Sequence, residues 1–304
     1  MDTASVLQDL INGVSAGLCY ALVAIGFTLI FGVLNAINFA HGEVAMLGAF
    51  AGLFIALAFS PPFVALLLIV AAVGAGLGVG LERLGFRPLR RGRDEASLKS
   101  RALREATLLS SLAIGIIVRE LTEIAFGGDM QRVPDAVMIN QPVPWGDVIL
   151  VRGDFVIFAV ACITLVGLQL LLRRTSIGLA VRAVSDDLLG ALYAGVNADR
   201  VILWTFAIGS SIGAVAGLLI GLYYGVITPY MGFTPTLKAF VAMLMGGLTS
   251  IPGAVACAVL IGLCESFTTD FISSRWVGLV PYVLLLVTLV FFPGGLFGRR
   301  ADRV

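Results

Sequence analysis

Long runs without a charged residue constrain this chain more than any other feature. One run separates Asp9 from Glu43, and the next separates Glu43 from Glu82. The other uncharged runs are 155–172, 201–237, 239–264 and 276–298. Each can supply one or two segments of the roughly 20 apolar residues that a helix needs to cross a bilayer. Because backbone groups in lipid need partners within the protein, continuous runs favour helices over the alternating strands of a membrane barrel.

The expected fold is all-α, a polytopic transmembrane helical bundle of about seven to eight spans that uses the whole chain as one domain. Hydrophobic residues make up 59% of the chain and charged residues 13%, whereas soluble domains carry about 25% charged residues. The expected spans are 9–33, 42–60, 63–82, 106–125, 154–172, 201–224 and 277–297, with a broken or re-entrant segment near 236–268.

The positions of Lys and Arg indicate which loops face the cytoplasm. Most of them lie in loops 83–105 and 173–200 and in the tail after residue 298, and short loops rich in Lys and Arg face the cytoplasm. The N-terminus and loops 126–153, 225–235 and 269–276 should face the other side. The first ten residues lack Lys and Arg, so we expect no cleaved signal peptide.

Other compositional features exclude several classes of site. The net charge of +1 gives no indication of nucleic acid binding. The cysteines, Cys19, Cys162, Cys257 and Cys264, lie in apolar segments without metal-site spacing. We interpret them as small buried hydrophobic residues and expect no metal site.

The sequence MGGLTSIPGA, residues 245–254, interrupts the apolar pattern. One full span here would place the arginines that follow the last helix on the wrong side of the membrane. Two half-helices would instead enter and leave on the same side. Such breaks are tolerated at membrane depth where protein or a water-filled path surrounds them. The alternative is a kinked packing helix. The candidate pathway residues in this segment are Gly246, Gly247, Thr249, Pro252 and Gly253.

A glycine recurs at every fourth position of the span 201–224. On a helix this spacing makes one stripe, and small residues let membrane helices approach closely. We interpret the stripe as a packing surface, the alternative being a helix that slides or lines a narrow path. Its members are Gly209, Gly213, Gly217 and Gly221.

The sequence lacks a recognisable source of energy for transport. A P-loop needs GxxxxGK[ST], and neither Lys99 nor Lys238 completes it. Ionisable residues within expected spans are few. We interpret Arg119 and Glu123 as a local ion pair at i,i+4, and Glu265 as reaching the membrane interface. We therefore expect no enzymatic site, and energy supplied by a partner.

Loop 173–200 has helical periodicity, and Ser185 or Asp186 could cap a second short helix. Its apolar residues near one face are Ile177, Val181, Val184, Leu188, Leu192 and Val196. A compact helical loop of this kind suits docking into a groove on a soluble protein. An amphipathic loop resting on the membrane surface explains the pattern equally well.

Four long segments together resemble one family. They are GFTLIFGVLNAINFAHGEVAMLGAF (26–50), SIGLAVRAVSDDLLGALYAGVNADRVILWTFAIGSSIGAVAGLL (176–219), KAFVAMLMGGLTSIPGAV (238–255) and FPGGLFGRR (292–300). In this order they resemble the LivH-type permease subunit of bacterial branched-chain amino acid ABC importers, over nearly the whole chain. The resemblance implies a bacterial inner-membrane protein with a LivM-like second permease, two cytoplasmic ATPases and a periplasmic or extracellular solute-binding protein. No cofactor is expected in this chain, because the partner subunits would bind ATP.

The resemblance also assigns loop 173–200 as the segment that couples to the ATPases. Arg182 and Asp186 would act at the contact, by charge pairing or by capping the coupling helix, and Asp187 is an extra acid relative to the family pattern. The residues that match the pattern are Gly178, Arg182, Ala183, Asp186, Ala191 and Gly195.

A polar cluster lies between the first two expected spans, at Asn38, His41, Gly42 and Glu43. One interpretation is structural: Asn38 ends a helix, Gly42 permits a turn, and Glu43 stabilises the next helix N-terminus. The other places the cluster on the transport pathway, contacting solute or the break at 246–253. A single histidine is a poor metal site, and the role of His41 stays open.

The sequence therefore predicts a permease that carries branched-chain amino acids or a similar small polar solute into the cytoplasm. Alternatives are urea, amides or other amino acids as solute, a self-sufficient channel or ion-coupled carrier, and a membrane-anchored scaffold. The sequence does not identify the solute.

Overall fold

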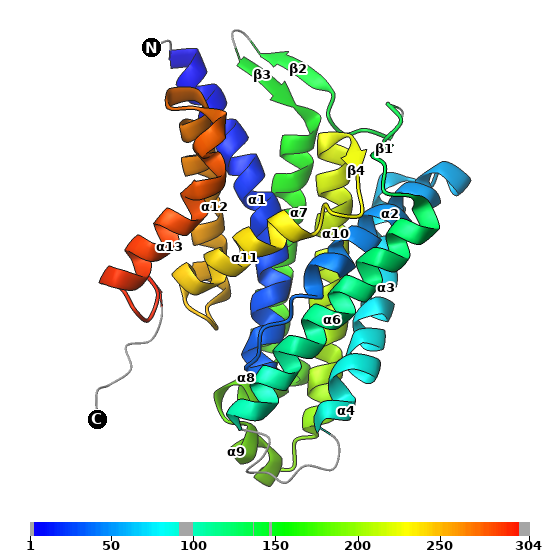
Figure 1. Ribbon diagram of the computed structural model, residues 1–304, viewed down its shortest axis with the longest axis vertical. Helices are drawn as coiled ribbons and strands as arrows, with labels where there is room; N and C mark the ends of the chain where they lie inside the picture. The colour runs from blue at the N-terminus through cyan, green and yellow to red at the C-terminus, as the bar shows by residue number, and fades with distance from the viewer. Residues whose placement is uncertain (1–2, 91–99, 136, 146–147, 298–304) are drawn as a thin grey trace.

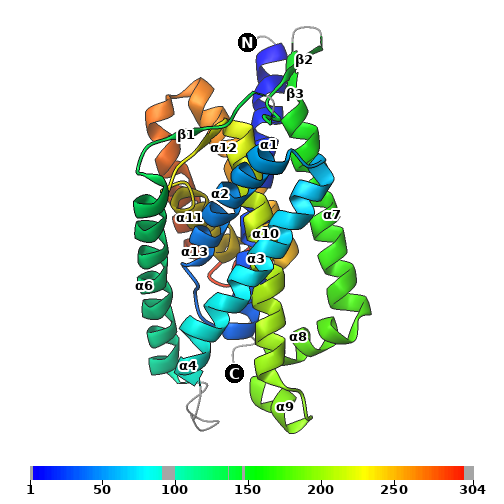
Figure 2. The ribbon, with the colours of Figure 1, turned by 90° about the vertical axis from the view of Figure 1, so that its right-hand side faces the viewer.

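The chain forms an elongated helical bundle in a computed structural model that describes residues 3–90, 100–135, 137–145 and 148–297 (Figures 1 and 2). Within these described ranges, seven helical segments are long and apolar enough to cross a membrane, which confirms the predicted all-α polytopic bundle. The helices are α1 (Thr3–Leu34), α2 (His41–Phe59), α3 (Phe63–Leu81), α4 (Arg87–Arg90), α6 (Arg101–Phe126), α7 (Arg152–Arg174), α8 (Ser176–Asp186), α9 (Leu188–Tyr193), α10 (Ala198–Tyr224), α11 (Phe233–Gly246), α12 (Ile251–Phe271) and α13 (Val280–Phe291).

Helices α1 and α10 form the centre of the bundle. In their most apolar stretches, 89% of the α1 residues and 78% of the α10 residues are buried, against 22% for the segment containing α3 and 17% for α7. The outer helices expose large apolar side chains such as Leu68, Ile163 and Leu286. Such faces suit contact with lipid, which is itself apolar.

The glycine stripe of α10 faces a different neighbour at each position. A Cβ on Gly209 would lie 2.9 Å from the Gly26 carbonyl oxygen of α1, and a Cβ on Gly213 would lie 2.7 Å from the His41 ring. A Cβ on Gly217 would overlap the backbone of α2 at Ala45. Gly221 approaches Ile227, where a Cβ would lie 2.7 Å from its side chain. Close approach at successive levels lets α10 pack simultaneously against α1 and α2.

The interrupted segment is a helical hairpin. α11 has 14 residues, fewer than the roughly 20 needed to span a bilayer, and both α11 and α12 extend from the turn toward the same end of the bundle (Figure 1). Gly247 has a φ of +99° at the turn, and the Ser250 side chain accepts a hydrogen bond from the Gly253 N–H at 3.2 Å, capping α12. The predicted break is therefore confirmed, and it lies between Gly246 and Ile251.

Short strands lie at the end of the bundle where α1 begins (Figure 1). β2 (Pro142–Trp145) and β3 (Val148–Val151) form an antiparallel hairpin, with Pro142 opposite Val151. β1 (Gln131–Arg132) pairs with β4 (Val226–Ile227), also antiparallel. The pairing brings two loops predicted to face the same side, 126–153 and 225–235, into contact.

The structure corrects two local predictions. α1 ends at Leu34, one residue beyond the predicted span 9–33, and Asn38 does not end it, because Asn35 already adopts a left-handed conformation with φ +51°. The expected loop 83–105 is helical on both sides of the undescribed residues 91–99. A π-helical turn, Glu82–Phe86, joins α3 to α4, and α6 begins at Arg101. The basic residues at 91–99 and 298–304 that entered the orientation argument lie outside the described residues.

Candidate functional site

The loop between α7 and α10 is two short helices, each held by a side-chain cap. Thr175 accepts from the Gly178 N–H at 3.0 Å to begin α8, and Asp187 accepts from the Leu189 N–H at 3.2 Å to begin α9. The predicted cap at Ser185 or Asp186 was therefore wrong. The Ser185 hydroxyl instead donates to the Gly32 carbonyl of α1 at 2.7 Å, which attaches α8 to the bundle.

Three residues of the predicted coupling set shape this loop from inside. Gly178 touches the α7 backbone, where any Cβ would overlap Leu171 and Leu172. Ala191 is buried in an apolar cluster with residues of α1 and α10. Gly195 has a φ of +82°, a conformation that favours glycine, just after α9. Their common role is to fix the path of the chain.

The other three lie on α8. Arg182 and Asp186 are exposed, and Ala183 is half-buried. Arg182 and Asp186 are four residues apart and so lie on one helical face. The structure thus leaves both charged side chains open to a partner.

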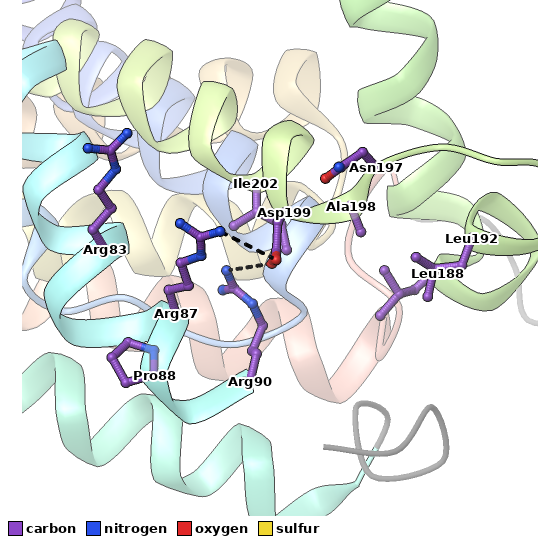
Figure 3. Close-up of a pocket in the computed structure, with 10 residues that line it drawn as sticks. All are labelled: Arg83, Arg87, Pro88, Arg90, Leu188, Leu192, Asn197, Ala198, Asp199 and Ile202. Carbon is purple, nitrogen blue, oxygen red and sulfur yellow. Dashed lines mark ion pairs between the residues drawn. The ribbon is translucent and has the colours of Figure 1, made fainter. Parts of the chain in front are cut away.

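A groove of about 720 Å³ lies beside this loop, between α4 and the start of α10 (Figure 3). Asp199 faces two arginines, with nitrogen–oxygen distances of 4.0 Å to Arg87 and 3.6 Å to Arg90. Arg90 also pairs with Glu82, which is 1% exposed. The groove lining is Arg83, Arg87, Pro88, Arg90, Leu188, Leu192, Asn197, Ala198, Asp199 and Ile202.

The groove could not be predicted from the sequence. Its two walls are about a hundred positions apart in the chain, and the π-helical turn that redirects the arginines has no clear sequence signal. The concentration of arginines after Glu82 was visible, but their partner Asp199 was not.

His41 lies inside the bundle between α1 and α10. A Cβ on Gly26 would lie 2.8 Å from the imidazole Nε2, and a Cβ on Gly213 would lie 2.7 Å from its Cε1. The Phe27 ring meets the imidazole edge-on, with ring centroids 5.9 Å apart. The two glycines therefore make the space that the imidazole fills. Asn38 is also buried, at 3% exposure.

Gly42 and Glu43 face α11 and α6 rather than the break. A Cβ on Gly42 would lie 2.7 Å from the Gly232 carbonyl oxygen and would overlap the Thr236 hydroxyl. Thr236 is about 15 Å along α11 from Gly246, at 1.5 Å per residue. The expectation that the polar turn contacts residues 246–253 is therefore not met. Gly42 instead allows close packing against the start of α11.

The residues of the break gather at the hairpin turn. Gly246 and Gly253 touch through their backbones, and Gly247 meets the chain at Gly295. Thr249 and Pro252 are exposed. Gly42 and the residues of the break thus lie at opposite ends of α11.

Residues 10–289 match the family model described as "Branched-chain amino acid transport system / permease component". The chain belongs to this family. The predicted resemblance is confirmed, and the chain is a multi-pass membrane permease component.

The sequence similarity to known permeases extends over almost the whole chain. The chain is 34% identical to the high-affinity branched-chain amino acid transport system permease protein BraD of Pseudomonas aeruginosa, over 96% of each protein. It is 34% identical to the LivH permease protein of Escherichia coli K12, again over 96% of each. A probable LivH permease of Methanocaldococcus jannaschii is 26% identical, over 91% of this chain and 88% of that protein.

The permease also holds a buried ion pair that sequence analysis did not predict. The Lys238 Nζ of α11 lies 2.8 Å from both carboxylate oxygens of Glu265 in α12. The Tyr20 hydroxyl of α1 donates to Glu265 Oε2 at 2.9 Å and accepts from Lys238 Nζ at 2.9 Å. Glu265 is 5% exposed, so the idea that it reaches the interface was wrong. Lys238 and Glu265 are the only charged residues between 201 and 269. Two opposite charges isolated in an apolar stretch were the sign in the sequence that they could pair.

The predicted Arg119–Glu123 pair was also wrong. Arg119 pairs with Glu120, with a nitrogen–oxygen distance of 3.7 Å. Glu123 accepts from the Tyr230 hydroxyl at 2.6 Å, and the Arg119 guanidinium lies 5.6 Å from the centre of the Tyr230 ring. Tyr230, in the segment before α11, thus contacts both Arg119 and Glu123, which do not pair with each other among the described residues.

Proposed function

We propose that this permease is one of two membrane-spanning subunits of an importer that moves branched-chain amino acids into the cytoplasm, driven by ATP that separate subunits hydrolyse. The observation that carries the proposal is the capped two-helix loop α8–α9, which leaves Arg182 and Asp186 exposed at one end of the bundle. The relatives are named as branched-chain amino acid transport proteins, which supports the choice of solute.

The assembly would contain several other chains. A LivM-like permease would complete the pathway, two ATPases would bind ATP at the α8–α9 end, and a solute-binding protein would deliver the solute from outside. The permease itself would need no cofactor. It would lie in a bacterial inner membrane, with its N-terminus outside and its C-terminus in the cytoplasm. Basic residues at the α8–α9 end support this orientation: Arg83, Arg87, Arg90, Arg173, Arg174, Arg182 and Arg200.

The loop is attached so that a force on it would reach the centre of the bundle. The Ser185–Gly32 hydrogen bond links α8 to α1. Val181 and Val184 of α8 share a buried cluster with Ile202 of α10. Tightly packed contacts transmit displacement rather than absorb it. An ATPase that moves α8 would therefore move α1 and α10, the two helices that enclose His41.

Charge reversal on α8 tests the docking surface. Arg182→Glu and Asp186→Arg should each reduce the ATPase that co-purifies from native membranes by at least about tenfold, because like charges brought together in an interface cost well over 1 kcal/mol. The measurement is the ratio of ATPase to permease after affinity purification in mild detergent.

Arg275→Glu is the matched control, an exposed charge reversed in the segment before α13, at the opposite end of the bundle (Figure 1). It should retain the ATPase at the wild-type level. Equal ATPase retention by all three variants, with equal membrane insertion, would reject α8 as the docking site.

A further inference from the structure

A small pocket of about 210 Å³ lies where α2, α6 and α11 meet. Its charged residues are Glu43 of α2 and Arg119 of α6. Its apolar residues are Phe39, Leu112, Ile116, Phe233 and Leu237. The pocket thus combines one acid, one base and an apolar wall within the helical part of the protein.

Glu43 is a buried acid with unused hydrogen-bonding capacity. The residue is 7% exposed, and its Oε2 has no hydrogen-bond partner in the described structure. Ionisable groups inside a membrane bundle are costly and mark sites of function. A bound cationic group would provide the missing partner.

Arg119, which lines the same pocket, also has unused hydrogen-bonding capacity. Its Nε is buried and without a hydrogen-bond partner among the described residues, while its Nη2 pairs with Glu120 at 3.7 Å. Among the described ion pairs, none joins Arg119 to Glu43. The two opposite charges therefore line one pocket without forming an ion pair with each other among the described residues. A guanidinium is well suited to hold a carboxylate.

We infer that this pocket binds the zwitterionic head of an α-amino acid, the ammonium at Glu43 and the carboxylate at Arg119, with an apolar side chain against Leu112 and Ile116. The inference rests on the proposed function for the identity of the solute, and adds a binding site on the permease itself. A neutral amide or urea would satisfy neither charge. An amino acid with a charged side chain would meet the apolar wall.

Gly115 supports this assignment because it keeps the pocket open. A Cβ there would lie 3.6 Å from the Glu43 Cγ, which is ordinary contact. Larger side chains would extend beyond that point into the space between α6 and α2. Gly115 therefore offers a variant that blocks the pocket and leaves both charges in place.

Binding of radiolabelled L-leucine to the purified full-length permease in nanodiscs tests the site. Competition with isocaproate, which lacks the ammonium, and isoamylamine, which lacks the carboxylate, separates the two contacts. The wild type should prefer leucine to either analogue by at least about tenfold. Glu43→Gln should lose the discrimination against isocaproate, Arg119→Gln should lose it against isoamylamine, and Gly115→Leu should abolish binding.

The double variant Arg101→Gln/Glu105→Gln is the matched control. It removes an acid and a base from the same helix, where they form an exposed pair with 87% and 60% of their side chains accessible. It should bind leucine as the wild type does. If a charge variant fails to fold, Gly115→Leu still decides the question.

Two results would overturn the inference: no saturable leucine binding to the wild type at millimolar concentrations, or unchanged binding and discrimination in all three pocket variants. Leucine import by the assembled transporter separates this failure from failure of the proposed function. Intact ATP-driven import with unaffected pocket variants would leave the function standing and remove only the site.

Discussion

Replacing Lys238 with methionine should destabilise the permease by about 3–5 kcal/mol, the cost of removing one partner from a buried ion pair. The loss leaves the Glu265 carboxylate, 5% exposed, with the Tyr20 hydroxyl as its one remaining hydrogen-bond partner among the described residues. Because Lys238 joins α11 to Glu265 of α12 and to Tyr20 of α1, α11 should loosen from both helices. The measurement is the fraction of monodisperse protein that survives a temperature series in detergent.

Two variants separate a charge effect from a packing effect. Lys238→Met/Glu265→Leu removes both charges and should recover most of the lost stability, since an apolar replacement of a buried pair is often neutral. Arg101→Met breaks an exposed pair with a nitrogen–oxygen distance of 2.7 Å and should cost at most about 1 kcal/mol. A Lys238→Met protein as stable as the wild type, or a double variant no better than the single one, would contradict this account of the hairpin.

Adding one methyl group at Gly217 should disturb the centre of the bundle. The new Cβ of Gly217→Ala would overlap the Ala45 carbonyl of α2, and backbone atoms cannot rotate away as a flexible side chain can. α10 and α2 must therefore separate, at a cost of about 1–3 kcal/mol for overpacking. The loss should appear in the same thermal assay, even though alanine favours a helix over glycine by about 1 kcal/mol.

Gly80→Ala is the control for this substitution. Gly80 lies in α3, and a Cβ there meets no atom within 4 Å. Helix propensity should dominate at that position, so the variant should be neutral or slightly more stable. Equal behaviour of Gly217→Ala and Gly80→Ala would mean that the α10–α2 contact does not limit stability.

The sequence was sufficient to predict features that depend on neighbouring residues. The uncharged runs predicted the membrane helices, because length and apolarity decide whether a segment can cross a bilayer. The glycines and proline around residues 246–253 predicted the hairpin, because they interrupt a helix wherever it lies. The family resemblance predicted the permease.

Features that depend on contacts between distant segments were missed. Lys238 and Glu265 are 27 positions apart, and only the hairpin geometry brings them together. Ser185 looked like a helix cap, but its hydroxyl reaches Gly32 in another helix. Local patterns identify which residues could cap or pair, and tertiary packing selects among them.

Uptake of radiolabelled leucine into proteoliposomes shows whether this permease imports amino acids only together with ATP-hydrolysing partners. The vesicles would contain this permease with its co-purified permease and ATPase partners, with the solute-binding protein added outside and ATP trapped inside. We expect uptake that needs ATP and is lost with Arg182→Glu. Leucine uptake by this permease alone, without ATP or partners, would contradict the account and establish a self-sufficient carrier or channel.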